Sequence, residues 1–441
     1  MSFQTGLSGL NASSRNLDVI GNNIANANTT GMKSSRAEFS AMYSSMLGYG
    51  GASNKGIGVE VGTVAQQFSQ GSLSTTGNSL DVAVNGNGFF QIKLTDGSSA
   101  YTRDGSFKLD KDGFIKTNAD ANVMGFPTDV KGVPTGVTLQ PIKLPTSAPI
   151  AAKQTDSVRL RMNLDAKATP AAGVPAVVGP PAVAAIPPTP RSTYGTSVNV
   201  YDAQGVATPV SLYFEKDAAA NTWNVFTSLD TTAQPSTTPI GVITFNADGT
   251  IKTATPPPTK TPPDFGIVLA AGTIASRNPN DANKLLDQPI TIDLGKTDGT
   301  DATAVTQYGT SFAIADLTQD GYTAGELTGV SIGEDGVISA RYSNGQTQAA
   351  GQLALADFRN TQGLTPLGGN AWAETFESGQ PISGSPATGK FGALRAGALE
   401  DSNVELTKEL VDMMTAQRAY QANAQTIKTQ DQIMSTLVNL K

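Results

Sequence analysis

Residues 3–26 read FQTGLSGLNASSRNLDVIGNNIAN, and this stretch decides the fold together with its counterpart at the other end of the chain. Its apolar side chains recur every seven residues, at Phe3, Leu10, Leu17 and Ile24. Residues 399–434 repeat that spacing, at Leu399, Leu406, Met413, Tyr420, Ile427 and Met434. A seven-residue recurrence is typical of helices that pack along each other. The two ends therefore predict partner helices.

The stretch between the ends has the pattern of β-structure. Residues 80–84 and 89–94 read as strands around the turn Asn85-Gly86-Asn87-Gly88. Asp-Gly pairs follow, and Asp-Gly between strand-like segments is a strong hairpin signal. We predict an α+β chain that is mainly β. Its terminal helices are expected to pair as a coiled-coil-like domain, with outer antiparallel β-domains that are formed discontinuously.

The composition excludes several classes of function. The 441 residues include no Cys and no His, which rules out thiol nucleophiles, Ser-His-Asp triads and zinc sites built on these residues. The net charge is −7, and no basic block is present to neutralise the phosphates of a nucleic acid. No constellation of paired carboxylates stands out. We therefore expect no enzyme activity, no catalytic residues and no nucleic-acid partner.

Two local motifs resemble ligand sites but have simpler interpretations. The Gly86-Asn87-Gly88 segment lacks the third glycine of a dinucleotide fingerprint, and strand residues follow it instead of a helix. The segment from Asp110 to Gly113 lacks the spaced acids and the later Glu of a calcium loop. Both are expected to be turns, so we predict neither a cofactor nor a bound metal.

The sequence shows no targeting or membrane-spanning segment. A cleavable signal peptide needs a basic start and an apolar run, whereas residues 1–6 are mostly polar. No stretch approaches the roughly 20 apolar residues of a membrane helix. We expect no membrane insertion. Composition alone leaves open a cytosolic protein and one that is exported without a cleaved peptide.

Changes in composition along the chain predict its domains. A terminal helical polymerisation domain is expected from 1–30 and 400–441, followed by a linker at 31–70. A discontinuous β-domain is expected from 71–145 and 316–399. An outer β-domain, 146–315, is inserted into it and carries a Pro-rich loop at 166–191.

Both terminal helices have recognisable boundaries. The N-terminal helix is expected over 4–28, ended by Thr29-Thr30-Gly31, because glycine accepts the left-handed turn after a helix. Its many Asn residues are poor helix formers, so this helix needs a partner. The C-terminal helix is expected from about 402 to 438, with Ser402 and Glu405 as a capping box.

The apolar stripes have two interpretations. They can be core helices within one monomer, or they can associate between copies of the chain. Two helices alone bury little apolar surface, and the rest of the chain offers no further long helix. Packing between copies is therefore favoured. The candidate polymerisation residues are Leu7, Leu10, Leu17, Ile20, Ile24, Leu406, Leu410, Met413, Tyr420, Ile427, Met434 and Leu437.

Longer motifs at both ends resemble a known family. The segment LSGLNASSRNLDVIGNNIAN at 7–26 resembles the N-terminal signature of the bacterial flagellar rod and hook proteins. The segments QRAYQAN at 417–423 and IKTQD at 427–431 resemble the matching C-terminal signature, and the ending TLVNLK is similar to that of the hook members. With the regions 80–126 and 341–372, the resemblance covers about half of the chain.

The resemblance implies a structural role. It implies a hook subunit that polymerises into a flexible hollow tube, with the terminal helices inside and the β-domains outside, and that transmits torque from rod to filament. The implied partners are copies of itself, the rod protein and the hook-filament junction protein at the ends, and the hook cap and type III export apparatus during assembly. The implied location is extracellular, in the hook of the hook-basal body, after export without a cleaved signal peptide.

Two features depart from the family pattern, and two rival functions remain open. The Pro/Ala insert at 166–191 is not part of that pattern, and Met32 stands where related sequences often carry an aromatic residue. The nearest rival is the distal rod subunit of the same family, although the large 146–315 insertion fits a hook better. The rival from a different class is a secreted adhesin or enzyme displayed on a β-stalk.

Overall fold

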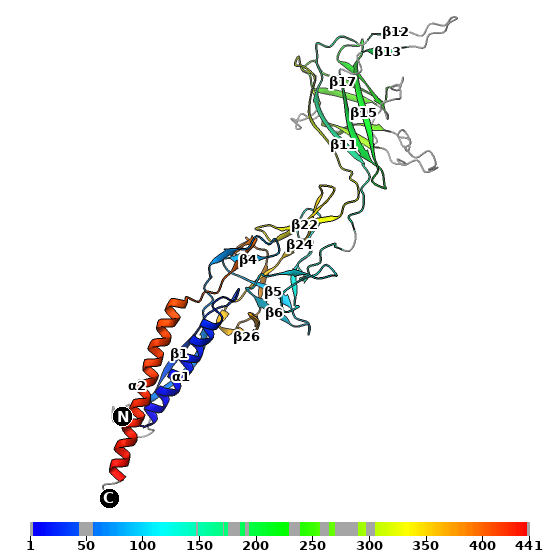
Figure 1. The fold of residues 1–441 in the computed structure, drawn as a ribbon. Helices are drawn as coiled ribbons and strands as arrows, with labels where there is room; N and C mark the ends of the chain where they lie inside the picture. Colours follow the sequence, from blue (N-terminus) through cyan, green and yellow to red (C-terminus); the bar gives the residue numbers. More distant parts are fainter. Residues whose placement is uncertain are drawn as a thin grey trace. The chain divides into compact units, whose positions relative to one another are not determined.

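The computed structural model describes residues 3–43, 56–146, 149–170, 172–174, 186–189, 194–228, 239–255, 264–269, 290–296 and 305–438. The chain divides into two compact units, each of which is described by itself (Figure 1). The first combines Met1–Ala148 with Leu327–Lys441, and the second is Pro149–Glu326. The described residues are mainly β-strand, with a long α-helix near each end of the chain.

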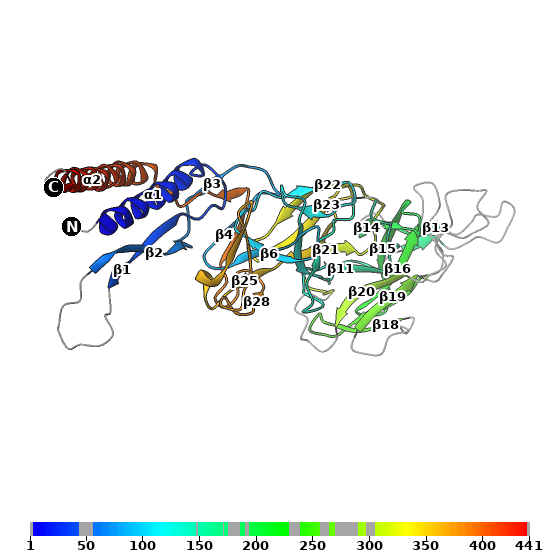
Figure 2. The ribbon, with the colours of Figure 1, turned by 90° about the horizontal axis from the view of Figure 1, so that it is seen from below.

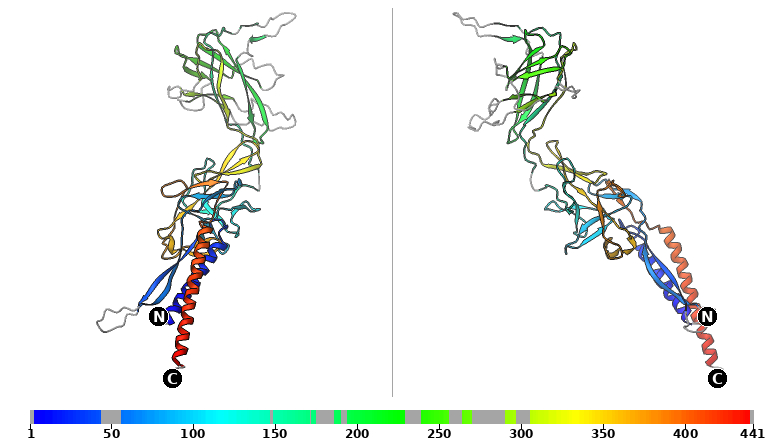
Figure 3. Two further views of the ribbon diagram at one scale, coloured as in Figure 1. Left: turned by 60° about the vertical axis from the view of Figure 1, so that its left-hand side comes forward. Right: turned by 180° about the vertical axis from the view of Figure 1, so that it is seen from behind.

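The two long helices belong to the first unit. Helices α1 (Phe3–Ala25) and α2 (Leu406–Val438) lie side by side (Figures 1 and 3). Strands β1 (Ser35–Tyr43) and β2 (Gly56–Gln66) form an antiparallel two-stranded sheet beside α1 (Figure 2).

The segment expected to be a linker at 31–70 therefore carries two long strands. Main-chain pairing along the whole length of both strands, from Ser35 with Gln66 to Tyr43 with Gly56, holds them together. Contact with α1 supports one face of the hairpin, and Ala37 is buried there. Two extended segments with a helix against them satisfy their backbone groups, which an unstructured linker would not do.

The β-domain of the first unit is a 13-stranded sheet with strands from both chain segments. Strand β9 pairs with β24 and strand β5 with β25, so residues more than 200 positions apart in the sequence share the sheet. Its strands are β5 (Phe89–Lys93), β6 (Ser99–Thr102), β7 (Lys108–Leu109), β8 (Ile115–Lys116), β9 (Asn122–Phe126), β10 (Gln140–Pro141), β22 (Leu327–Ile332), β23 (Val337–Tyr342), β24 (Thr347–Leu353), β25 (Leu355–Asp357), β26 (Thr365–Gly368), β27 (Ala371–Ala373) and β28 (Ile382–Gly384).

Two short antiparallel pairs complete this unit. Strand β4 (Val82–Asn85) pairs with β29 (Ala393–Ala396), and β3 (Leu73–Thr75) pairs with β30 (Ala398–Glu400). A 3-10 turn, Thr361–Gly363, lies between β25 and β26. Buried apolar residues fill the interior, and a separate aromatic cluster lies next to them, made of Phe68, Phe89, Tyr101, Phe358 and Trp372.

The second unit contains two larger sheets around one core. The first sheet has the order β19 (Asp264–Leu269), β20 (Ile290–Lys296), β11 (Ser157–Asn163) and β21 (Ala313–Gln319). The second has the order β14 (Gly195–Tyr201), β15 (Ala207–Lys216), β16 (Thr222–Ser228), β17 (Gly241–Phe245) and β18 (Ile251–Thr255). Alternate residues of both sheets, such as Leu160 of β11 and Leu212 of β15, belong to one buried cluster. This is the arrangement of a β-sandwich.

The Pro-rich segment 166–191 falls partly outside the described residues. Within its described part, β12 (Ala172–Val174) pairs antiparallel with β13 (Ile186–Thr189). The expectation of a plain loop is corrected to this extent. Proline at the edge of such a short pair is tolerated because it removes few ladder hydrogen bonds.

The helix boundaries differ from the predicted ones. Helix α1 ends at Ala25, not near residue 28. Helix α2 begins at Leu406, so the predicted capping box at Ser402 is wrong. The Ser402 hydroxyl accepts a hydrogen bond from the Val404 N–H, and residues 398–400 belong to β30. Side-chain hydrogen bonds of Asn403 keep the chain extended for a few residues more.

Candidate assembly interface

The helix pair is antiparallel, and small residues line the contact. A β-carbon on Gly6 would lie 3.1 Å from Cγ1 of Ile427. Further along α1, Asn23 donates from Nδ2 to the carboxylate of Glu409 at 3.1 Å. The early part of α1 therefore faces the late part of α2. Glycine lets two helix backbones approach closely because it has no side chain, which explains its presence inside a helix.

Asn23 ties three elements together. Its side chain is 1% exposed, and besides Glu409 it donates to the Ser35 carbonyl at 2.8 Å and accepts from the Ser35 N–H at 2.9 Å. It thereby joins α1 to α2 and to the start of β1. Sequence analysis counted this residue only as a poor helix former. Its place three residues after Ile20, on the same helical face, was the signal that it belonged to the contact.

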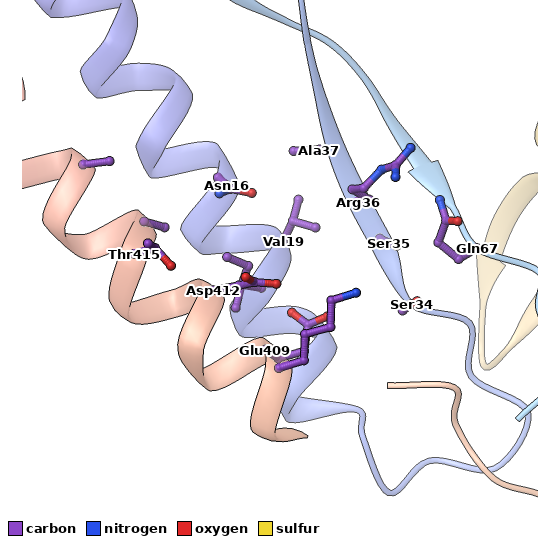
Figure 4. A pocket seen from close by; sticks show the side chains of 14 residues that line it. Asn16, Val19, Ser34, Ser35, Arg36, Ala37, Gln67, Glu409, Asp412 and Thr415 are labelled. Atoms are coloured by element: carbon purple, nitrogen blue, oxygen red, sulfur yellow. The ribbon is translucent and has the colours of Figure 1, made fainter. Parts of the chain in front are cut away.

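The other side of α1 faces the hairpin. The Ser8 hydroxyl accepts a hydrogen bond from the Val59 N–H of β2 at 3.3 Å, and Ala12 is buried. A cleft of about 600 Å³ lies between α1, α2 and β1 (Figure 4). Figure 4 shows Glu409 and Asp412 of α2 on the side of α1 that carries Val19.

Two acidic residues, Glu409 and Asp412, and two basic residues, Arg36 and Lys408, line this cleft. Burial raises the pKa of Glu409, and the nearby Asp412 carboxylate raises it further, whereas the hydrogen bond from Asn23 and the charge of Lys408 lower it. The net direction is upward from the ordinary value of 4.5. Among the described residues no group of acidic side chains is arranged to hold a metal ion.

The structure separates the predicted polymerisation residues into three groups. Ile20 is buried, whereas Leu10, Leu17, Ile24, Met413 and Ile427 are half-buried. Leu7, Leu406, Leu410, Tyr420 and Met434 are exposed. Leu437 belongs to α2, but its side chain lies outside the described residues. The contact between α1 and α2 therefore leaves five of these eleven described side chains exposed.

Family models match successive parts of the chain. The N-terminal segment 3–33 matches the flagella basal body rod protein model, and 395–440 matches the flagellar basal body rod FlgEFG protein C-terminal model. Residues 83–159 match the flagellar hook protein FlgE/F/G D1 domain, and 163–322 match the flagellar basal body protein FlaE D2 domain.

Curated relatives match over the full length. The chain is 38% identical to the flagellar hook protein FlgE of Escherichia coli strain K12, covering 100% of both chains. It belongs to the flagellar hook protein family. The hook protein FlgE of Treponema pallidum is 33% identical, with 100% of this chain and 99% of that protein covered.

A solved structure supports the fold. The crystal structure of the Helicobacter pylori flagellar hook protein FlgE2 matches with a TM-score of 0.51 at 16% identity, covering 74% of this chain and 100% of that one. At this identity the likeness concerns the fold alone. Among the described residues of this hook-family chain, no helix is long and apolar enough to cross a membrane.

Proposed function

We propose that this chain is a structural subunit of the bacterial flagellar hook, which polymerises into a flexible hollow tube and transmits torque from rod to filament. One observation carries the proposal. The helices that match the rod and hook family leave apolar side chains exposed next to a helix contact that small and polar residues already satisfy. Leu410, for example, is 49% exposed on α2. Exposed apolar residues that gather along one pair of helices point to a binding partner.

The partner is a second copy of the chain. In this proposal α1 and α2 pair as a coiled-coil-like domain, and their remaining apolar side chains pack against the helices of neighbouring copies. Burying one leucine contributes about 1.5–3 kcal/mol, so several per subunit suffice to hold a tube together. Identical contacts related by a screw axis do not close on themselves and therefore generate a filament.

The β-domains lie outside the tube and are formed discontinuously, with 146–315 inserted into the domain made by 71–145 and 316–399. Exposed polar contacts between neighbouring β-domains are individually weak, which permits sliding as the tube bends. The strand pairing of β9 with β24 and of β5 with β25 supports a domain built from separate chain segments.

The remaining partners follow from the family. We infer contacts with the rod protein and the hook-filament junction protein at the two ends of the tube. During assembly, the hook cap and the type III export apparatus would handle the subunit, without a cleaved signal peptide. The protein is then located outside the cell, in the hook of the hook-basal body. Nothing in this role calls for enzymatic activity.

A pair of variants tests the proposal. Leu410→Asn removes an exposed apolar side chain from α2, whereas Val137→Asn removes an exposed apolar side chain from the β-domain. We expect Leu410→Asn to abolish tubes in electron micrographs while circular dichroism shows folded β-domains, and Val137→Asn to assemble normally. Normal tubes from Leu410→Asn, or no tubes from the unmodified chain, would contradict the proposal.

The distal rod subunit is the nearest rival, because both terminal models are shared with rod proteins. The FlaE D2 domain match over 163–322 favours the hook. A decisive comparison is complementation. We expect the gene to restore hooks to a strain without a hook protein and to fail in a strain that lacks the distal rod protein.

A further inference from the structure

Three charged side chains are buried where the terminal segments meet the β-domain. Lys33 Nζ lies 2.6 Å from Oε1 of Glu400, and Arg103 Nη1 lies 3.2 Å from Oε2 of the same carboxylate. The side chains of Lys33 and Glu400 are 0% exposed. Lys33 lies between α1 and β1, and Glu400 is the last residue of β30, shortly before α2. Both connections to the helices therefore meet at one carboxylate.

The backbone around Glu400 is bound in the same way. Its Oε1 accepts a hydrogen bond from the Gly71 N–H at 3.0 Å, and its carbonyl oxygen accepts one from the Gly31 N–H at 2.8 Å. Lys33 also donates to the Ser69 carbonyl at 2.8 Å. One residue thus holds the segment after α1, the segment after β2 and the segment before α2.

Two asparagines reinforce this arrangement. Asn403 accepts a hydrogen bond from the Ser34 N–H at 2.7 Å and donates to the Gln67 carbonyl at 2.7 Å. Asn370 of the β-domain donates to the Thr30 carbonyl at 2.7 Å. Several hydrogen bonds therefore connect the segments that lead from the helices to the β-domain, and those of Asn403 and Asn370 join a side chain to a main-chain group.

Stability alone does not account for buried charges at this position. Removing three charged groups from water is unfavourable, and well-packed apolar residues often stabilise a protein as well or better. Burial accordingly lowers the pKa of Lys33, although Glu400 opposes that effect. Buried charged hydrogen bonds do favour a single geometry, because each group that leaves its partner stays without one in a low-dielectric interior. Arg103 is further fixed by the Gly86 carbonyl at 3.0 Å.

We propose that Lys33, Arg103 and Glu400 form a clamp that positions the terminal helices for assembly. The clamp fixes the directions in which α1 and α2 leave the β-domain, so that load on the helices reaches the β-domain without a hinge. This inference rests on the proposed function for its purpose. The clamp itself can be tested in the unassembled chain, so its failure is distinguishable from failure of the hook assignment.

The first test is hydrogen exchange on the full-length monomer. Glu400→Gln keeps the shape of the side chain but removes its charge, and Glu38→Gln removes the same charge from the exposed Arg36–Glu38 pair. We expect amide exchange in 29–34 and 67–72 to rise roughly tenfold or more in Glu400→Gln, as for loss of charged hydrogen bonds. Amide exchange in strands β5 and β6 of Glu400→Gln should not change. Glu38→Gln should leave exchange in 29–34 and 67–72 unchanged.

The second test uses assembled tubes. If Glu400→Gln does not fold, Lys33→Met replaces it, since this change keeps the Arg103–Glu400 pair. We expect tubes of the clamp variant to be more flexible in electron micrographs than tubes of the unmodified chain and of Glu38→Gln, a change that a purely stabilising role would not cause. Unchanged exchange at 29–34 in a folded clamp variant, or tubes of equal stiffness, would overturn the proposal.

Discussion

A β-carbon on Gly9 of α1 would lie 3.0 Å from both side-chain amide atoms of Asn423 on α2. Gly6 has the same relationship with Ile427, one helical turn earlier. The contact between the two helices therefore depends on missing side chains as much as on apolar ones. Other apolar residues of the two helices, such as Leu7 and Leu410, remain exposed.

The first prediction compares two glycines of the same helix. Gly9→Leu should separate α1 from α2 and destabilise the helix pair by about 1–3 kcal/mol, the usual cost of overpacking a tight contact. A β-carbon on Gly21 would meet no neighbouring atom within 4 Å, so Gly21→Ala should stabilise α1 by about 0.5–1 kcal/mol. Urea unfolding followed by far-ultraviolet circular dichroism measures both. Equal effects of the two changes would contradict the contact.

The second prediction concerns pH. Because the pKa of Glu409 in the folded chain lies above its ordinary value of 4.5, the folded state binds this proton more tightly than the unfolded state. The contribution of Glu409 to stability is therefore largest below pH 4.5 and is lost as the pH rises through the raised pKa. Glu409→Gln imitates the protonated form and should stabilise the chain at neutral pH.

The control for this prediction is the difference in unfolding free energy between Glu409→Gln and the unmodified chain, measured at each pH. We expect the stability advantage of Glu409→Gln, measured by urea unfolding, to shrink as the pH falls below the raised pKa. Other carboxylates titrate in both chains and cancel in the difference. An advantage that does not vary between neutral and acidic pH would mean that the carboxyl group does not titrate as the structure implies.

The third prediction uses the two tryptophans of the sequence, one in each compact unit. Trp223 is buried in the core of the second unit and Trp372 in the aromatic cluster of the first. Leu212→Ala should destabilise the second unit by about 2–5 kcal/mol, because it leaves a cavity in that core. In a chain that also carries Trp372→Phe, only Trp223 contributes tryptophan fluorescence. Its unfolding transition should then occur at a lower urea concentration with Leu212→Ala than without it.

The matched measurement follows the fluorescence of Trp372 during urea unfolding, in a chain that carries Trp223→Phe. Its transition should be the same with and without Leu212→Ala, since Trp372 reports on a separate core. A common shift of both signals would show that the two units unfold as one.

The fourth prediction concerns the turn after α1. Gly31 has a φ of 68°, and a β-carbon there would lie 2.5 Å from the Asp104 backbone nitrogen. Gly97 also has a positive φ, 89°, but a β-carbon there would meet no atom within 4 Å. Gly97→Ala should cost about 1–2 kcal/mol from the left-handed backbone alone. Gly31→Ala should cost clearly more, as measured by thermal unfolding, and a smaller loss than that of Gly97→Ala would refute the close contact.

Local patterns were predictable from the sequence. The positions of the two long helices, the strands expected near residues 80–84 and 89–94, and the mainly β middle were predicted correctly. Each of these depends on side-chain periodicity or on turn chemistry within a few residues. The absence of Cys and His likewise required no structure. The start of α2 was missed, because Asn403 bonds to residues that are distant in the sequence.

The candidate interface was predictable only in part. Seven-residue spacing identified the apolar stripes and favoured packing between copies of the chain, which stays a prediction, but it did not indicate which members would remain exposed. Leu410 and Ile20 have the same apolar character, yet one is exposed and the other buried. The tertiary packing distinguishes them, since Ile20 lies in the cleft between α1, α2 and β1.

The sequence by itself determined the helices, the hairpin turns and the family, because each depends on patterns among residues that are close in the sequence. Only the tertiary structure showed that Asn23 and Lys33 are buried, since polar residues of these types are usually solvated. Lys33 meets its carboxylate partner 367 positions away. A buried polar group is stable only with such a partner, and no local pattern specifies which distant residue the fold will bring to it.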